Sequence, residues 1–149
     1  MEHTGTKIKK YIVLFLLMGD IYYVLEGFWR GWSNIIMLFI GGLCGLIIGL
    51  INEKTKLKIW QQCLIDTIII ICIEFIFGVI LNRWLRLEIW NYDKLCGNIL
   101  GQICLPYSIL WFFLIPVAIW FYNWLKYRLY NEKESERLIE IYIKLVTNK

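Results

Sequence analysis

Histidine, proline and several signature motifs are scarce or missing in this 149-residue sequence, and each shortage excludes a class of protein. His3 is the only histidine, so Ser–His and Cys–His catalytic pairs cannot form. The five cysteines are scattered through apolar segments without a CxxC spacing, which favours buried thiols over a disulfide framework or a metal site. No GxxxxGK(S/T) motif occurs, so nothing resembles a nucleotide-binding P-loop. We therefore expect no cofactor and no metal, and a solvated His3 in the polar N-terminal tail.

Long apolar stretches dominate the sequence. The residues are 59% hydrophobic and 17% aromatic, with a mean hydropathy of +0.58, beyond the usual range of a soluble domain. A hydrocarbon core about 30 Å thick needs about 20 mainly apolar residues per helix. Four stretches meet or approach this length: 11–29, 32–51, 59–81 and 99–122. The sequence therefore predicts an all-α integral membrane protein with four transmembrane helices.

Glycine and proline positions predict how these helices pack. Gly41, Gly45 and Gly49 recur every four residues, so another helix can approach one face of the second helix closely. Pro106 and Pro116 are expected inside the fourth helix, where each removes a backbone donor and favours a kink. Carbonyls freed in lipid need partners, so the fourth helix is expected beside protein or a wet cavity.

Carboxylates inside the predicted helices are the strongest functional signal. Asp66 and Glu74 lie two turns apart on the third helix, about 12 Å at 1.5 Å rise per residue. A carboxylate at the bilayer centre costs about 2.5–3.5 kcal/mol on insertion scales, so such groups usually face the bundle interior or water. Near the end of the first helix, Glu26 and Arg30 are four residues apart on one face. They form either a structural ion pair or part of a site.

The basic residues predict the orientation. The N-terminal tail, the connection at 52–58 and the C-terminal segment carry most of the lysines and arginines and share one side in a four-helix scheme. By the positive-inside bias this side, with both termini, is cytoplasmic. We divide the chain into a transmembrane bundle, residues 1–125, and a charged cytoplasmic tail, residues 126–149. The tail contains a predicted amphipathic helix, which could lie on the membrane, meet a partner or be solvated; its apolar positions are Leu138, Ile141, Tyr142 and Leu145.

A polar and aromatic hinge, from Arg83 to Ser108, leads without a clean boundary into the last predicted helix. We expect a turn at Trp90–Asp93 and a helix start at Asn98–Gln102. In the four-helix scheme both face outward, on the same side as the first connection and above Glu74. This arrangement predicts an outward cup of aromatic, acidic and amide groups over a buried carboxylate. The candidate ligand-binding residues from this reasoning are Glu26, Arg30, Glu74, Trp90, Tyr92, Asp93, Asn98 and Gln102.

The run EFIFGVILNRWLRLEIWNYDKLCGNILGQICLPYSILW, residues 74–111, resembles a longer known pattern. The pattern is approximately E-F-x-x-G-x-x-x-N, then W-D-Y-S-x-x-P-x-N-x-x-G-Q-I-C-L-x-F-S-x-x-W. It is typical of a family of small bacterial membrane proteins named putative ABC-transporter permeases (type IV, CmpB-like). The upstream run GDIYYVLEGFWRGWSNIIMLFIGGLCGLIIG is also similar to the family's first half. The resemblance therefore covers most of the chain, from Gly19 to about Trp124.

The resemblance implies further assignments. It adds Asn82 to the ligand-binding residues, and it implies a multi-pass protein in a bacterial inner membrane. Since the chain has no P-loop, ATP, if involved, would be bound by another polypeptide. The sequence departs from the family pattern at four positions, where Asn91 replaces Asp, Asp93 replaces Ser, Cys96 replaces Pro and Pro106 replaces an aromatic residue. The positions that match are Glu26, Arg30, Gly31, Glu74, Gly78, Asn82, Trp90, Tyr92, Asn98, Gly101, Gln102 and Cys104.

Three main functions remain open from sequence, beside an ion channel or holin-like pore, for which the uncharged second helix offers no obvious lining. The first is a transport or substrate-capture component whose outward cup binds a small polar or cationic solute. The second is a non-catalytic membrane interaction or regulatory protein, in which the buried acids only pair with arginines. The third is an intramembrane enzyme that uses carboxylates alone for acid–base chemistry. The expected partners are the lipid bilayer, a small solute and either further copies of the chain or another membrane or ATPase subunit. The net charge of +4 comes largely from flanking segments, so no nucleic-acid partner is expected.

Overall fold

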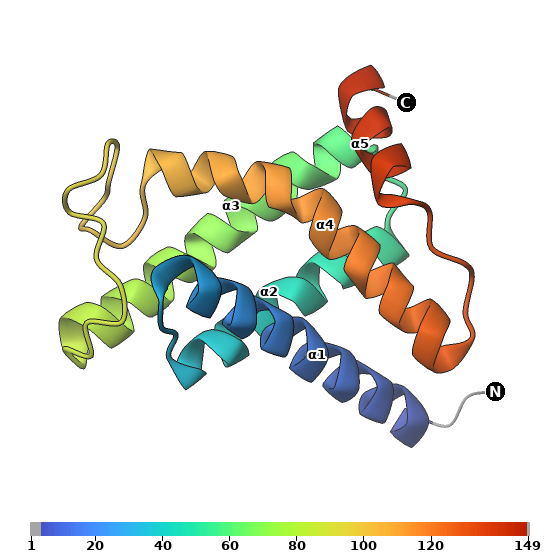
Figure 1. Cartoon of the computed structure of the whole chain (residues 1–149), viewed down its shortest axis with the longest axis horizontal. Helices are drawn as coiled ribbons and strands as arrows, with labels where there is room; N and C mark the ends of the chain where they lie inside the picture. Colours follow the sequence, from blue (N-terminus) through green and yellow to red (C-terminus); the bar gives the residue numbers. More distant parts are fainter. Residues whose placement is uncertain (1–3, 149) are drawn as a thin grey trace.

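The computed structural model describes residues 4–148, and throughout them the regular structure is helical (Figure 1). His3, expected to be solvated, lies outside the described residues. The elements are α1 (Thr4–Arg30), α2 (Ile35–Lys54), α3 (Ile59–Gly78), a π-helical turn η1 (Val79–Trp84), α4 (Leu105–Tyr130) and α5 (Leu138–Thr147). Four spans are long and apolar enough to cross a membrane: Gly5–Arg30, Ile35–Lys54, Ile59–Trp84 and Leu105–Tyr130. The predicted all-α membrane fold is confirmed.

The fourth membrane helix begins later than predicted. The residues expected to start it, Asn98–Gln102, lie in the loop, and an isolated bridge pairs Ile99 with Ile103. Leu100 and Gly101 have positive φ values of 52° and 68°, which a right-handed helix cannot accommodate. Pro106 is therefore in the first turn of α4, where proline is tolerated, and the predicted kink there is wrong. Pro116 does lie inside α4.

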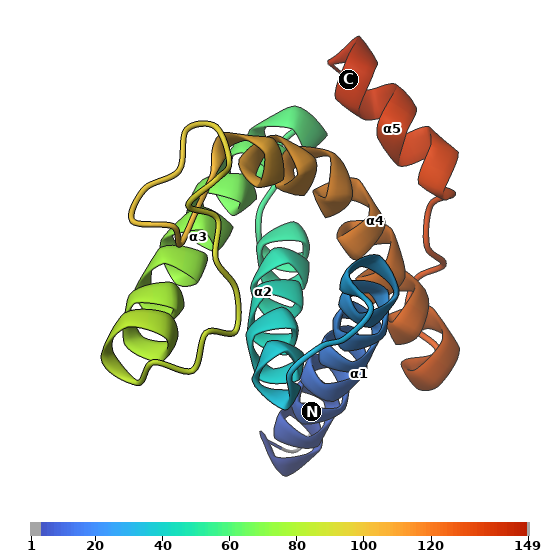
Figure 2. The same ribbon diagram turned by 60° about the vertical axis from the view of Figure 1, so that its left-hand side comes forward.

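The small-residue face of α2 brings its neighbours very close. An ideal Cβ at Gly41 would lie 2.6 Å from the Tyr22 ring, and one at Gly45 would lie 2.7 Å from the Cβ of Met18, both on α1. A Cβ at Gly49 would meet the ring of Tyr122 on α4. The glycines therefore allow α1 and α4 to pack directly on α2, and α1 and α2 lie side by side in Figures 1 and 2.

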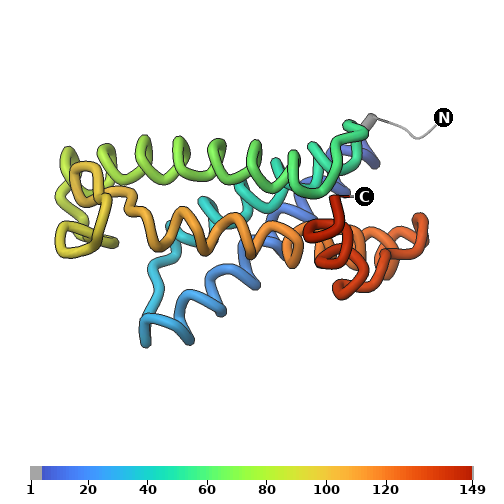
Figure 3. The backbone as a smooth tube through the Cα atoms, turned by 90° about the horizontal axis from the view of Figure 1, so that it is seen from above, coloured from blue at the N-terminus to red at the C-terminus, as the bar shows by residue number. Residues whose placement is uncertain are grey.

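The two ends of the molecule differ in character. In Figure 3, α3 and α4 run alongside each other, with loop 85–104 at one end and α5 toward the other. The start of α1 also lies toward the α5 end, where Lys10 pairs with Glu132 just after α4. We refer to these as the loop end and the tail end. The start of α1 and the C-terminal helix therefore lie at the same end of the molecule. This is the arrangement expected of a chain that crosses a membrane an even number of times.

The C-terminal helix packs on its own chain. Ile141 of α5 is buried, and the Tyr142 hydroxyl donates to the carbonyl of Phe113 in α4 at 2.6 Å. Leu145 packs against the main core. The residues Ile139, Ile143 and Val146 are exposed on the remaining surface of α5. The boundary expected after residue 125 falls inside α4, which continues to Tyr130 and ends with Asn131 in the left-handed conformation.

Candidate functional site

Loop 85–104 is anchored to the end of the third membrane helix by a few specific hydrogen bonds. Asn82, on η1, accepts from the backbone N–H of Ile89 at 2.7 Å and donates to Oε1 of Gln102 at 2.9 Å. The indole N–H of Trp90 donates to the carbonyl of Gln102 at 3.0 Å. Trp90 and Gln102 are both 5% exposed, so these bonds are shielded from competing solvent. The loop therefore has a defined conformation over the bundle.

The side chain of Asn98 forms hydrogen bonds within loop 85–104. Its side-chain amide donates to the carbonyls of Asp93 and Leu95 at 3.1 and 3.0 Å, and its oxygen accepts from the N–H of Gly101 at 3.3 Å. A Cβ at Gly101, which has positive φ, would collide with the Asp93 carboxylate. Asn98 therefore holds the loop's shape, and it lines neither of the cavities at this end.

A cavity of about 880 Å³ lies beneath this loop. We call it the loop-end cavity. Its walls come from α1, α3, α4 and the loop, which the fold brings together from distant parts of the sequence. Six of the nine predicted site residues line it: Glu26, Arg30, Glu74, Trp90, Tyr92 and Asp93. The other lining residues are Tyr22, Leu25, Trp29, Asn91, Lys94, Leu95, Tyr107, Leu110, Trp111 and Leu114.

Glu74 is the buried carboxylate of this cavity. It is 7% exposed, and its Oε1 accepts a hydrogen bond from the indole N–H of Trp111 at 3.0 Å. Among residues 4–148, no lysine or arginine forms an ion pair with Glu74. A buried carboxylate is costly unless it is paired and hydrogen-bonded. Glu74 thus has one donor and unused capacity on its second oxygen.

Glu26 and Arg30 form the expected i,i+4 pair. The guanidinium donates to Glu26 at 2.7 Å, and the hydroxyl of Ser33 also donates to this carboxylate. A second guanidinium nitrogen donates to the carbonyl of Ile89 at 2.5 Å. Arg30 also lies 4.5 Å from the centroid of the Trp32 ring. This pair ties α1 to the loop, and its charges are already matched.

Aromatic rings form the walls of the loop-end cavity. Tyr22 stacks on Trp111 with ring centroids 5.6 Å apart, and Tyr92 stacks on Tyr107 at 4.9 Å. Trp29 donates from its indole N–H to the Tyr107 hydroxyl at 3.3 Å. Burial, reinforced by Glu74 and Tyr107, raises the pKa of the Tyr92 hydroxyl. The hydroxyl therefore stays neutral over the physiological range.

Two of the remaining predicted residues, Asn82 and Gln102, lie outside the loop-end cavity. Asn82 and Gln102 line a separate depression of about 590 Å³, whose other lining residues include Arg83 and Glu88. Trp90, Asn91 and Asp93 are shared by the two cavities. Asn82 and Gln102 thus do not line the loop-end cavity. They affect it only by fixing the position of Trp90, which does line it. The structure does not bring all nine predicted residues into one cavity.

Four aromatic residues that line the loop-end cavity were not among the nine predicted site residues: Tyr22, Trp29, Tyr107 and Trp111. Tyr22 precedes Glu26 by four residues, and Trp111 follows Tyr107 by four, so each pair lies on one helical face. This spacing was visible in the sequence. What the sequence could not show was that the two faces meet across Glu74, because α1 and α4 are separated by more than 70 residues.

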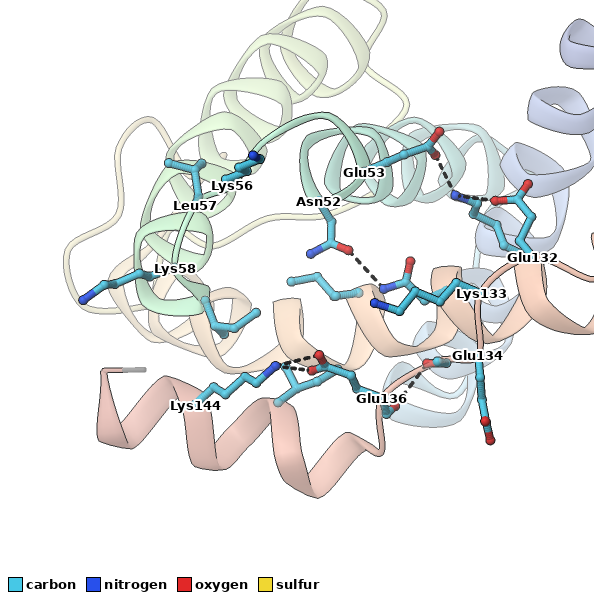
Figure 4. A pocket seen from close by; sticks show the side chains of 16 residues that line it. Asn52, Glu53, Lys56, Leu57, Lys58, Glu132, Lys133, Glu134, Glu136 and Lys144 are labelled. Carbon is cyan, nitrogen blue, oxygen red and sulfur yellow. Dashed lines mark hydrogen bonds and ion pairs between the residues drawn. The ribbon is translucent and has the colours of Figure 1, made fainter. Parts of the chain in front are cut away.

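A further cavity, of about 590 Å³, lies at the tail end (Figure 4). Lys126 pairs there with both Glu53 and Glu132, at 2.9 Å in each case. Lys144 pairs with Glu136 at 2.6 Å. The cavity is lined by charged and amide groups from the end of α2, the connection at 55–58, α4, the following segment and α5. We call it the tail-end cavity.

Comparison with known proteins gives one match. No curated protein and no solved structure is a significant match to this chain. A family model described as putative ABC-transporter type IV matches residues 9–147, nearly the whole chain. The match agrees with the four apolar spans, and a family of this description suggests a membrane complex with other subunits. The chain is a multi-pass membrane protein that belongs to the putative ABC-transporter type IV family.

Proposed function

We propose that this protein is the membrane-embedded, solute-capturing component of a transport system, and that its loop-end cavity binds a small organic cation. One observation carries the proposal. Glu74 is a buried carboxylate with a single indole donor, it lies on an aromatic cavity, and no basic residue among residues 4–148 forms an ion pair with it. Intramembrane carboxylates of this kind commonly mark a substrate or ion path.

The aromatic part of the wall suits a cation with apolar substituents; the wall also contains two basic residues, Arg30, which is paired with Glu26, and Lys94. Tyr22, Trp111, Tyr92 and Tyr107 all border the cavity. Ring faces attract a cation by about 0.5–2 kcal/mol each, and alkyl groups on the nitrogen gain contact with the same rings. A cavity of about 880 Å³ is in the range of small-molecule sites. A quaternary ammonium compound meets both requirements.

Pairing within the protein distinguishes the two glutamates of the cavity. Glu26 is matched by Arg30 and Ser33, so a purely structural role accounts for it. Glu74 has no equivalent partner. The hypothesis that the buried acids only pair with arginines therefore accounts for Glu26 but does not account for Glu74.

The wider assembly follows from the same proposal. Four spans are few for a complete transporter, and the sequence has no P-loop. We expect copies of this chain to associate with each other or with another membrane subunit, and any ATP hydrolysis to take place in a separate subunit. The tail end, with both termini, faces the cytoplasm of a bacterial cell, and the loop end faces outward.

Choline and its neutral isostere 3,3-dimethylbutan-1-ol test the proposal. Isothermal titration of the purified protein should show that choline binds and that the isostere binds at least tenfold more weakly. Glu74→Gln should lower choline affinity by about tenfold or more, because the ammonium loses its attraction to a carboxylate charge, which is about 4 kcal/mol at about 4 Å with an effective dielectric constant of about 20, and about 1.4 kcal/mol corresponds to tenfold in affinity. Asp20→Asn, which changes an exposed carboxylate of α1 away from the cavity, should have no effect. Equal binding of the two compounds, or no binding of choline, would contradict the proposal.

A further inference from the structure

Asp66 is a second buried carboxylic group on α3, and it lies outside the loop-end cavity. It is fully buried, at 0% exposure. Its Oδ2 accepts from the side-chain N–H of Gln62 at 3.0 Å, whereas Oδ1 has no hydrogen-bond partner in the described part of the chain. No lysine or arginine in that part forms an ion pair with it. A buried polar atom with no partner calls for a role beyond packing.

A line of three amides connects Asp66 to the tail end. Asn123 of α4 donates to Asn52 of α2 at 3.0 Å, and Asn52 donates to Gln62 of α3 at 3.0 Å. Gln62 in turn donates to Asp66 and to the carbonyl of Ile48, both at 3.0 Å. Three helices contribute one amide each to this line, which we call the amide seam.

The seam begins at the tail-end cavity. Asn52 and Asn123 are both part of its wall, and in Figure 4 the labelled Asn52 lies among the charged groups that surround this space. Buried polar atoms in a row are the surroundings in which interior water is held. The amides form a continuous hydrogen-bonded line from the tail-end cavity to Asp66.

Glu74 is approached from the opposite end. It follows Asp66 by eight residues on α3, about 12 Å along the axis at 1.5 Å per residue, and it borders the loop-end cavity. Between them the buried Ile70, 1% exposed, interrupts the polar groups. A single helix thus carries two carboxyl groups separated by an apolar side chain, with Glu74 on the loop-end cavity and Asp66 joined to the tail-end cavity by the amide seam.

We propose that Asp66 is a proton-binding site that exchanges with the tail-end cavity through the amide seam. In the uptake step, a hydronium ion in the cavity transfers its proton to a carboxylate oxygen of Asp66; an O–H bond forms and water remains. Release reverses the step. A proton site on the helix that carries Glu74 would let the proton gradient act on solute movement, and this last link rests on the proposed function.

The groups around Asp66 are mostly uncharged. On its own helix the nearest titratable neighbour is Cys63, which is fully buried. From α2 it faces the carbonyl of Ile48 and the Asn52 amide through Gln62. α5 packs on α3 and contributes Tyr142, whose hydroxyl is bonded to Phe113 of α4. Charged groups begin at the mouth of the seam, with Glu53 and Lys126.

Infrared difference spectroscopy between two pH values tests this proposal. The chain has only three aspartates, Asp20, Asp66 and Asp93, and the first and third are exposed. Labelling aspartate with ¹³C at the carboxyl carbon should therefore shift a pH-dependent carbonyl band that belongs to a buried acid. Asp66→Asn should abolish the band, and Asp20→Asn should leave it unchanged. If Asp66→Asn does not fold, the isotope shift in the unmodified protein still decides the question.

Access is tested by Asn52→Leu, which interrupts the seam without touching Asp66. After a rapid pH change, the band should respond at least tenfold more slowly in this variant than in the unmodified protein. A band that never changes with pH would show a purely structural acid and overturn the proposal. A band that changes with sodium at constant pH would also overturn it, in favour of a sodium site. Choline titration is independent of these results, so the proposed function can fail while the proton site stands, or the reverse.

Discussion

Replacing Gly78 by alanine should loosen the loop that covers the loop-end cavity. An ideal Cβ at Gly78 would lie 2.5 Å from Oε1 and 2.8 Å from the Cβ of Gln102. The side-chain oxygen can swing aside, but the Cβ moves only with the backbone. The backbone around Gln102 must therefore shift away from the end of α3.

The size of the effect follows from what Gln102 holds. Its bonds to Asn82 and Trp90, at 2.9 and 3.0 Å, contribute about 1 kcal/mol each. Overpacking adds a cost of about 1–3 kcal/mol, and the higher helix propensity of alanine offsets about 1 kcal/mol. We expect a net destabilisation of about 2–4 kcal/mol, concentrated in loop 85–104.

Hydrogen exchange and choline titration together measure how far loop 85–104 has loosened in Gly78→Ala. The amide of Ile89, which donates to Asn82, should exchange faster in Gly78→Ala, and choline affinity should fall at least threefold because Trp90 and Tyr92 lose their fixed positions. Gly27→Ala is the matched control, because its Cβ would meet only the Cβ of Ser33, at 3.9 Å. If the two variants behave alike in both assays, the anchoring role given to Gln102 is wrong.

Three further outcomes are expected. Gly49→Ala should destabilise the bundle by about 1–3 kcal/mol, since its Cβ would meet the Tyr122 ring; a denaturation midpoint equal to that of Gly27→Ala would count against close packing of α2 and α4. Arg30→Gln should cost about 1.5–3 kcal/mol by breaking the bonds to Glu26 and Ile89, with faster exchange in loop 85–104; unchanged exchange there would contradict the link. Burial acts to raise the pKa of Glu132, but hydrogen bonds from Lys10 and Lys126 outweigh it and hold the pKa below its usual value. A lowered folded-state pKa stabilises above the unfolded pKa, and this is lost as pH falls through the folded one. Glu132→Gln should thus remove part of the decline in thermal stability below about pH 4.3, and an unaltered pH profile would refute this.

Much of the fold was encoded in local pattern. Four apolar stretches predict four membrane helices because length and hydropathy alone decide whether a segment can span a bilayer. Gly41, Gly45 and Gly49 predict close packing because a glycine has no Cβ. A neighbouring helix can therefore approach closely, whichever part of the sequence that helix comes from. The positions of Glu26 and Arg30 likewise determine their pair through helical geometry alone.

The loop end was harder to predict because its conformation depends on contacts distant in sequence. Asn98 and Gln102 have a helical spacing, yet Leu100 and Gly101 adopt positive φ and Gln102 bonds to Asn82 twenty residues earlier. Such tertiary bonds override local propensity. For the same reason the sequence did not separate Asn82 and Gln102, which position Trp90, from the residues that line the loop-end cavity.

The tail end shows the same limit for Asp66. Its spacing from Glu74 was evident from the sequence, but its connection to the opposite end was not. Asn52, Gln62 and Asn123 come from three helices, and only their packing places the amides in one row. An ordinary asparagine near a helix end has no sequence feature that distinguishes it from a solvated one.

The contact between a bound cation and the rings beside Glu74 tests the central claim most directly. Nuclear Overhauser effects between the methyl protons of choline and the labelled rings of tryptophan and tyrosine report such a contact. At a choline concentration below the dissociation constant of the unmodified protein, we expect them to Trp111 and Tyr22, assigned with Trp111→Phe and Tyr22→Phe, and we expect all of them to disappear in Glu74→Gln. Contacts to neither ring, or contacts that persist in Glu74→Gln, would contradict a cation site built on this carboxylate.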